Sequence, residues 1–96
     1  MKTPRSRKAV RSELPYPLLL VEWEDSSRLG DGWIDLGEVR DPAPHRCVSV
    51  GYLVKSNRRG KVIVPTIADV EHPENSHAHG GIMIPSCAIL SVRRLS

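Results

Sequence analysis

Apolar and polar residues alternate along several short stretches of the chain, and no stretch repeats its apolar residues over the length of a long helix. The first stretch covers residues 18–23. Leu19, Val21 and Trp23 share one of its faces, because successive side chains of a strand point to opposite sides. The other face is also mainly apolar. The pattern therefore predicts a largely buried first strand that turns polar at its end.

The alternation continues on both sides of the letters NRRG at residues 57–60, which are typical of a turn. This arrangement predicts an antiparallel hairpin over residues 48–67. Gly51 interrupts the first of the two strands and predicts a bend or the close approach of another stretch of chain. Pro65 has no N–H to offer a strand ladder, so we expect it at a sheet edge or at the end of its strand.

The C-terminal part of the chain reads GIMIPSCAILSVRRL. It predicts a short strand over residues 82–84, one helical turn that begins with proline over residues 85–88, and a final strand over residues 88–95. With the first strand and the hairpin, this makes five short strands and no long helix. The fold class predicted is all-β.

Two polar excursions separate these strands. Residues 25–45 hold three glycines, two prolines and clustered acids, which predicts a long loop. Trp33, Leu36 and Val39 recur there at helical spacing and allow one helical turn. Loops of this length are uncommon in small domains and often serve recognition. Residues 71–80 predict a mobile polar loop, which ends in a Gly-Gly pair that permits unusual backbone angles.

Composition and charge refine this picture. The chain has 96 residues, 40% of them apolar, which suits one small domain, and it has no phenylalanine, so Val, Ile and Leu must build most of the core. Residues 1–11 hold five bases and no acid, residues 12–41 hold eight acids and two bases, and the remainder holds seven bases and three acids. We expect residues 1–14 to form a disordered basic tail and residues 15–96 to form a single domain.

The sequence also predicts where the protein is located and whether its cysteines are free. No apolar segment follows the basic start as it would in a secretory signal, and no run approaches the roughly 20 apolar residues that span a membrane. A cytoplasmic protein is expected. Cys47 and Cys87 lie far apart in strand-like contexts, which predicts buried free thiols. Without a CxxC pattern, a zinc ribbon or a thioredoxin-like redox site is not favoured.

The order of the predicted elements resembles the small five-stranded Src-homology-3-like barrel. The strongest local likeness is GIMIPSCAILSV at residues 81–92, since in that fold a strand ending in Ile/Val-Pro leads through one tight helical turn into a last short strand. The long first loop and the central hairpin match the same order. The resemblance implies a five-stranded barrel but no particular activity. The paired tyrosines and the signature tryptophan of the peptide-binding members are missing, so binding of Pro-rich peptides is not expected.

Three segments are also similar to short proteins of unassigned activity that tailed phages and prophages encode. They are VEWEDS at residues 21–26, SVGYLV at residues 49–54 and MIPSCAILSV at residues 83–92. This resemblance implies a phage or prophage origin, with the cytoplasm of the host cell as the location. It implies no mechanism.

The function predicted is that of a non-enzymatic binding module, with another protein or a second copy of the chain as its partner. The edges of a small sheet can pair with another chain, and an acidic loop suits a basic surface. Trp23 is expected in the core, whereas Trp33 is either a plug of the long loop or an exposed anchor. The residues expected to bind the partner are Trp33, Asp31, Asp35, Glu38 and Tyr52.

Nucleic-acid binding is the alternative from another functional class. A basic tail and a basic hairpin tip would neutralise phosphates in a salt-sensitive, sequence-independent way. The acidic segment before residue 42 would repel phosphates, and only Tyr52 and Trp33 are available to stack on bases. The residues expected to contact nucleic acid in this alternative are Lys2, Arg5, Arg7, Lys8, Arg11, Arg58, Arg59 and Lys61.

A metal site is a further alternative. His77 and His79 would point to the same side of an extended strand, and His72 with Cys47, His45 or Cys87 would complete a tetrahedral zinc site. No cysteine pair at a fixed spacing anchors such a site. No catalytic site and no cofactor are predicted, because the chain has no GxSxG, no HExxH and no phosphate-binding glycine loop.

Overall fold

The computed structural model describes residues 14–96, and the predicted basic tail lies outside the described residues except for Leu14. The strands are β1 (Leu18–Asp25), β2 (His45–Asn57), β3 (Gly60–Val64), β4 (Thr66–Ala68), β5 (His77–His79), β6 (Ile82–Pro85) and β7 (Ile89–Arg94). Three short 3-10 helices are η1 (Leu36–Glu38), η2 (Pro73–Asn75) and η3 (Ser86–Ala88). No helix in this part of the chain is long and apolar enough to cross a membrane.

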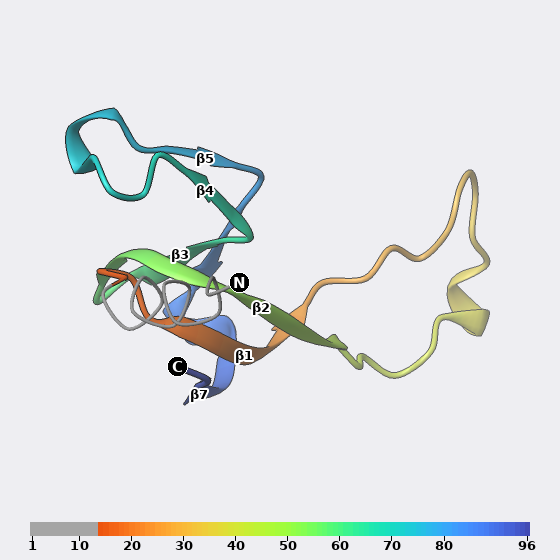
Figure 1. The fold of residues 1–96 in the computed structure, drawn as a ribbon. Helices are drawn as coiled ribbons and strands as arrows, with labels where there is room; N and C mark the ends of the chain where they lie inside the picture. The colour runs from red at the N-terminus through yellow and green to blue at the C-terminus, as the bar shows by residue number, and fades with distance from the viewer. Residues whose placement is uncertain (1–13) are drawn as a thin grey trace, which may run out of the picture.

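The strands form two antiparallel sheets, which confirms the all-β prediction. The main sheet has five strands in the order β6-β3-β2-β1-β7, and β4 pairs with β5 in a small second sheet (Figure 1). β1 lies inside the main sheet, paired with β2 on one side and with β7 on the other. Its position agrees with the apolar character of both of its faces.

One small cluster of apolar side chains forms the core. Leu19 and Val21 come from β1, Ile63 from β3 and Ile84 from β6, and all four are buried. Two strands separate β1 from β6 in the main sheet, so these side chains meet only because the sheet curls around its inner face. Burial of each such side chain contributes about 1.5–3 kcal/mol, so this cluster is the main source of stability.

The curl is centred on β2. An added Cβ at Gly51 would lie 3.0 Å from the carbonyl oxygen of Val64 and 3.1 Å from the Cβ of Ile63, so a larger residue would require β3 to shift by a few tenths of an ångström. The pairing of β2 with β3 then shifts its register between Leu53 and Lys55, and such a bulge increases the local twist. The close approach predicted at Gly51 is confirmed.

The main sheet curls without closing into a barrel. β6 and β7 are its two edges, and among residues 14–96 no strand pairing joins them. β6 directs its hydrogen bonds to β3, and η3 then turns the chain so that β7 pairs with β1. The expectation of a closed five-stranded barrel is therefore wrong, since closure would require a ladder between these two edges.

Most of the locally predicted elements lie where the sequence places them. β1 and the final succession of β6, η3 and β7 match their predictions. The hairpin of β2 and β3 also forms, but its return strand ends at Val64 and not at Ile67, because after Pro65 the chain enters β4 of the second sheet. Trp23 packs against the core, and its Nε1 donates a hydrogen bond to Ser49 Oγ at 2.9 Å. That bond satisfies the one polar atom of the indole.

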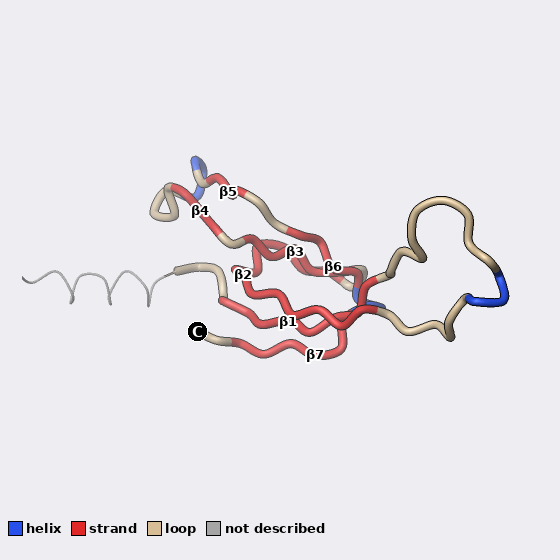
Figure 2. Tube along the Cα trace, turned by 90° about the vertical axis from the view of Figure 1, so that its right-hand side faces the viewer, coloured by secondary structure: helices blue, strands red, loops and turns tan. Residues whose placement is uncertain are grey.

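The second polar excursion contains regular structure, which corrects the loop expected over residues 71–80. β4 and β5 pair over three residues each, and η2 lies in the connection between them. The Ser76 hydroxyl donates to the carbonyl oxygens of Asp69 at 2.8 Å and His72 at 3.2 Å. These contacts hold the two ends of the connection between β4 and β5 together. Figure 2 shows the small hairpin standing beyond one end of the main sheet.

The two cysteines are free thiols, as predicted, but neither is buried. Cys47 is half-buried and Cys87 is exposed. In η3 the residue that packs against the core is Ala88. A 3-10 turn has three residues, so one of its side chains points inward while its neighbour points to solvent, and this is why the prediction of a buried Cys87 is wrong.

Candidate partner-binding site

A long loop, residues 26–44, leaves the main sheet between β1 and β2 and extends away from it (Figure 1). We call this loop the arm. Its two ends are held together, because Asp25 and His45 face each other as the last pair of the β1–β2 ladder. Every residue of the arm is exposed to solvent. The arm is thus a closed projection on a fixed base.

The arm is shaped by local hydrogen bonds. Asp35 Oδ1 accepts from the backbone N–H of Gly37 at 3.1 Å, and the N–H of Glu38 donates to the carbonyl oxygen of Asp35 at 2.9 Å, which together begin η1. Arg28 and Asp31 form an ion pair at 3.2 Å, but both side chains are almost fully in water, where such pairs add little. Within the described chain, each hydrogen bond of the arm spans at most three positions.

Large apolar side chains of the arm point into solvent. Trp33 is 103% exposed, Leu36 85% and Leu29 71%. Trp33 is therefore not a plug of the loop, and of the two roles considered for it only the exposed anchor agrees with its position. Ile34 and Val39 are less exposed, because they line a hollow of about 520 Å³ between the two limbs of the arm.

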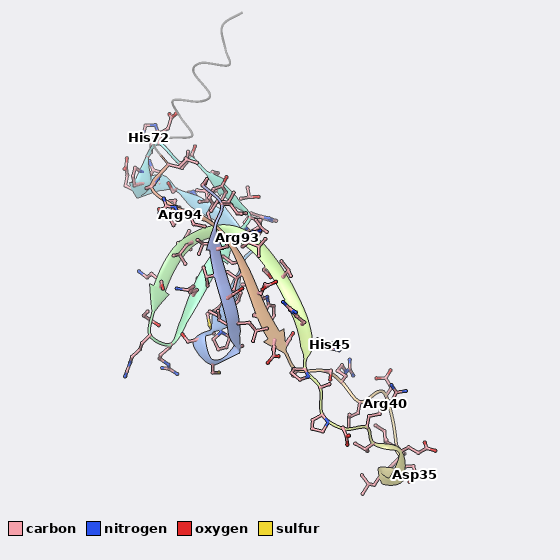
Figure 3. All side chains as sticks on the ribbon, turned by 90° about the horizontal axis from the view of Figure 1, so that it is seen from below. Asp35, Arg40, His45, His72, Arg93 and Arg94 are labelled. Carbon is pink, nitrogen blue, oxygen red and sulfur yellow. The ribbon has the colours of Figure 1, made fainter. Side chains whose placement is uncertain are left out.

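The acidic residues predicted to bind a partner lie on the same loop as this tryptophan. Asp31, Asp35 and Glu38 are all within five sequence positions of Trp33, and all four residues are exposed. Figure 3 shows Asp35 in the part of the arm that lies farthest from the sheet. The outer part of the arm therefore combines an apolar anchor with negative charge.

Tyr52 does not belong to this group. It lies on β2 and lines a groove of about 290 Å³ together with Tyr16, Pro65 and Ile67. The aromatic rings of this groove come from sequence positions 36 residues apart, so the alternation pattern alone did not reveal it. Among the residues that the structure describes, no charged one contributes to its lining.

The turn between β2 and β3 presents Arg58 and Arg59 on a well-held backbone. Asn57 Oδ1 accepts from the N–H of Arg59 at 2.8 Å and from the N–H of Gly60 at 3.2 Å. From the other side, Ser86 donates its N–H to the carbonyl oxygen of Arg59 at 2.9 Å and its hydroxyl to that of Arg58 at 2.8 Å. Both arginine side chains remain exposed.

A hollow of about 410 Å³ adjoins this turn on the outer face of β2, β3 and β6. We call it the basic hollow. Lys55 and Arg59 line it with positive charge, and Val62, Met83 and Pro85 line it with apolar surface. The antiparallel register sets Val62 opposite Met83, which the sequence could not specify in advance. Lys61, from the predicted basic tip, is half-buried, and its Nζ donates to Ser56 Oγ at 3.1 Å.

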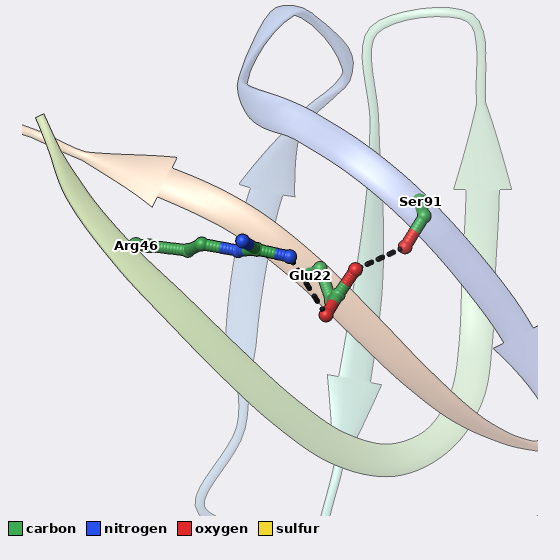
Figure 4. Close-up of polar contacts among 3 residues, drawn as sticks. All are labelled: Glu22, Arg46 and Ser91. Carbon is green, nitrogen blue, oxygen red and sulfur yellow. Dashed lines mark hydrogen bonds and ion pairs between the residues drawn. The ribbon is translucent and has the colours of Figure 1, made fainter.

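A polar cluster on the outer face of β1 ties three strands together (Figure 4). Glu22 accepts a hydrogen bond from Ser91 Oγ of β7 at 2.8 Å and pairs with Arg46 of β2 at 3.1 Å. The hydrogen bond from Ser91 and the positive charge of Arg46 lower the pKa of Glu22. The cluster links the three strands, since both carboxylate oxygens of Glu22 have a partner within it.

The three histidines proposed as metal ligands are exposed and do not form a site. His77 and His79 lie on β5, and His72 precedes η2. Among residues 14–96 there is no group of three or more His, Cys, Asp or Glu side chains placed to hold a metal ion. Figure 3 shows His72 and His45 well separated in the molecule. The lysines and arginines of the basic tail, Lys2, Arg5, Arg7, Lys8 and Arg11, lie outside the described residues.

Comparison of the chain with protein-family models, with curated proteins and with solved structures found no match. The function is therefore inferred from the surfaces described above.

Proposed function

We propose that this protein is a non-enzymatic binding module that engages a protein partner through its arm. The observation that carries the proposal is the full exposure of Trp33, together with the exposure of Leu36 and Leu29 on the same loop. Tryptophan is enriched among the residues that dominate binding energy at protein interfaces. Burying one large apolar side chain gains about 1.5–3 kcal/mol, and the arm offers several such side chains at one place.

The way the arm is anchored also supports this role. A loop with an unconstrained base would lose much conformational entropy on binding, whereas the arm is closed at its base by the Asp25–His45 pair and shaped locally by Asp35. The acids around Trp33 would favour a partner with a basic surface and would speed its encounter. The partner is thus expected to offer an apolar pocket with positive charge around it.

The proposal assigns no catalytic chemistry to the chain. A nucleophile needs a base within hydrogen-bond reach. Among residues 14–96 the serine and cysteine side chains donate to backbone carbonyls and to Glu22, while Ser49 and Ser56 accept from Trp23 and Lys61. These contacts have structural roles.

We also infer a Src-homology-3-like arrangement of the strands and a phage or prophage origin. Three features support the arrangement: the first strand lies between the second and the last, the central hairpin follows in the sheet, and a 3-10 turn precedes the last strand. The origin rests on the likeness of the segments at residues 21–26, 49–54 and 83–92 to proteins of tailed phages. In a phage context the host cytoplasm would be the place of binding.

The experiment that tests the arm compares the wild type with the double variant Trp33→Ala/Leu36→Ala as baits in a lysate of the cells that carry the gene. Bound proteins are identified by mass spectrometry, and their affinities are then measured with purified material. We expect the variant to lose the partner while its thermal midpoint stays that of the wild type, because the arm does not contribute to the core. Ser27→Ala, within the arm, is the matched control. Equal capture by the wild type and the double variant would show that the arm is not the binding element.

Nucleic-acid binding is the second candidate, and the well-held turn with Arg58 and Arg59 favours it. Because the backbone of this turn is already held, it loses little entropy when the arginine side chains contact phosphates. The test measures binding of random duplex and single-stranded DNA over a range of salt concentrations, with Arg58→Ala/Arg59→Ala and with a chain lacking residues 1–11. Binding that falls steeply with salt and weakens in both variants supports this candidate, and no binding at low salt excludes it.

A further inference from the structure

We propose that the arm of one copy docks into the basic hollow of a second copy, so that the chain associates with itself head to tail. This inference rests on the proposed function of the arm and names its partner. The structure offers both halves of such a contact: an acidic arm with exposed apolar side chains, and a basic hollow with an apolar floor.

The floor of the basic hollow suits an indole ring. Met83 is 59% exposed and lies beside Val62 and Pro85, so a flexible thioether is available for a favourable contact with an aromatic ring. Lys55 and Arg59 stand next to this floor, where a cation can lie over the face of the same ring. Trp33 is the exposed tryptophan that such a site would take up.

Charge selects this hollow over the groove lined by Tyr16 and Tyr52. Among residues 14–96, those that line that groove are all uncharged, so they would leave the acids of a docked arm without a balancing charge. At the basic hollow, Asp35 and Glu38 would meet Lys55 and Arg59 while Trp33 enters between them. Charge complementarity of this kind also sets the orientation of docking.

The basic hollow is built before any partner arrives. Gly60 in its lining is packed so closely that a Cβ would lie 2.7 Å from the carbonyl oxygen of Ile84. The backbone of Arg59 is held by Asn57 from one side and by Ser86 from the other. Binding therefore costs little reorganisation on this side, which favours affinity.

The geometry of the two surfaces determines the symmetry. The arm is attached to β2 at His45, whereas the basic hollow lies near the other end of that strand, at Asn57. The contact thus joins two different patches, so after one contact the first copy keeps a free hollow and the second copy keeps a free arm. A reciprocal second contact closes a two-fold dimer, whereas contacts with further copies give a ring or an open chain.

The decisive experiment measures mass by light scattering on size-exclusion chromatography over a wide concentration range at low salt. We expect the mass of the wild type to rise with concentration. Two variants should stay monomeric: Trp33→Ala/Leu36→Ala, which lacks the arm's anchors, and Arg59→Glu, which reverses the charge of the hollow. Arg94→Glu makes the same charge change outside the hollow and should associate like the wild type. Circular dichroism of every variant checks that the fold is kept.

A mixture of the two monomeric variants gives the sharpest result. Arg59→Glu still has an intact arm and Trp33→Ala/Leu36→Ala still has an intact hollow, so the mixture should form a dimer of one copy of each and no larger species. A mixture that stays monomeric overturns the head-to-tail contact.

The outcomes separate this inference from the proposed function. A wild type that remains monomeric at every concentration overturns self-association, while capture of another protein through the arm would still support the proposed function. Association that persists unchanged in Trp33→Ala/Leu36→Ala overturns the inference and removes the arm as the self-binding element. In a Trp23→Phe background, Trp33 is the sole tryptophan. Its emission should shift to shorter wavelength with increasing concentration, and a shift that is independent of concentration would indicate docking within one copy and overturn the proposal.

Discussion

The hydroxyl of Ser91 donates a hydrogen bond of 2.8 Å to the carboxylate of Glu22, and this contact joins the last strand of the chain to the first. The second carboxylate oxygen of Glu22 accepts from Arg46 on β2 at 3.1 Å. The Glu22 side chain thus links β7, β1 and β2 on the outer face of the sheet. This link helps to hold β7, which is an edge strand and, within residues 14–96, pairs with β1 alone in the main sheet. Both partners favour the charged carboxylate and lower its pKa.

This contact predicts a pH dependence of stability. The pKa of Glu22 in the folded protein lies below the ordinary value of 4.5, so the folded state binds fewer protons there than the unfolded state. The stabilisation is fully present above about pH 4.5, the unfolded value, and is lost as the pH falls through the folded pKa. We expect Glu22→Gln to be less stable than the wild type at neutral pH and to approach it in acid. Urea unfolding between pH 7 and pH 3 measures the difference, with Glu24→Gln as the control. Parallel pH profiles for the wild type and Glu22→Gln would contradict this assignment.

The position of the core predicts that alanine substitutions at two isoleucines of the same strand differ greatly in their effect on stability. Ile84 is fully buried, whereas Ile82 on β6 is 37% exposed although it points to the same face. Ile84→Ala should lower the free energy of unfolding by about 2–5 kcal/mol, because it leaves a cavity in the centre of the cluster. Ile82→Ala should cost clearly less. Chemical denaturation of both variants measures the contrast, and equal losses would mean that the core is not centred on Ile84.

The close packing of the β2–β3 turn predicts that alanine substitutions at two glycines differ in their effect on stability. A methyl group at Gly60 would approach the backbone carbonyl of Ile84, which cannot move aside without breaking the pairing of β3 with β6. Gly60→Ala is expected to cost about 1–3 kcal/mol. Gly37 in the arm has its nearest neighbour at 3.6 Å, the Asp35 carboxylate, so Gly37→Ala should stay within about 0.5 kcal/mol of the wild type. Thermal or urea unfolding of the two variants shows whether the loss of stability comes from close packing at Gly60 or from the replacement of any glycine.

The arrangement of the histidines predicts no stabilisation by zinc. His72, His77 and His79 belong to no group of three or more potential ligands among residues 14–96. Because a metal that binds only the folded state raises the thermal midpoint, added zinc and added chelator should both leave that midpoint unchanged. A rise with zinc that a chelator reverses, and that His77→Ala/His79→Ala abolishes, would establish the metal site instead.

The sequence by itself determined the local elements of this protein. Alternation of period two marked β1, β2 and β3, and turn chemistry marked residues 57–60, because both signals depend only on neighbouring residues. The Pro-containing segment that leads through η3 into β7 was recognisable for the same reason. β4 and β5 escaped detection because strands of three residues are too short to show an alternation.

The tertiary structure alone decided how these elements are used. Whether β6 and β7 meet depends on the curl of the whole sheet, which Gly51 and the bulge after Leu53 set together with the packing of Ile84 against β1. The basic hollow depends on cross-strand register, and the Glu22–Ser91 bond joins residues 69 positions apart. The sequence allowed two positions for the Trp33 side chain, an exposed anchor and a buried plug of the loop, because the pattern of neighbouring residues is compatible with both. Only the path of the arm away from the sheet distinguishes them.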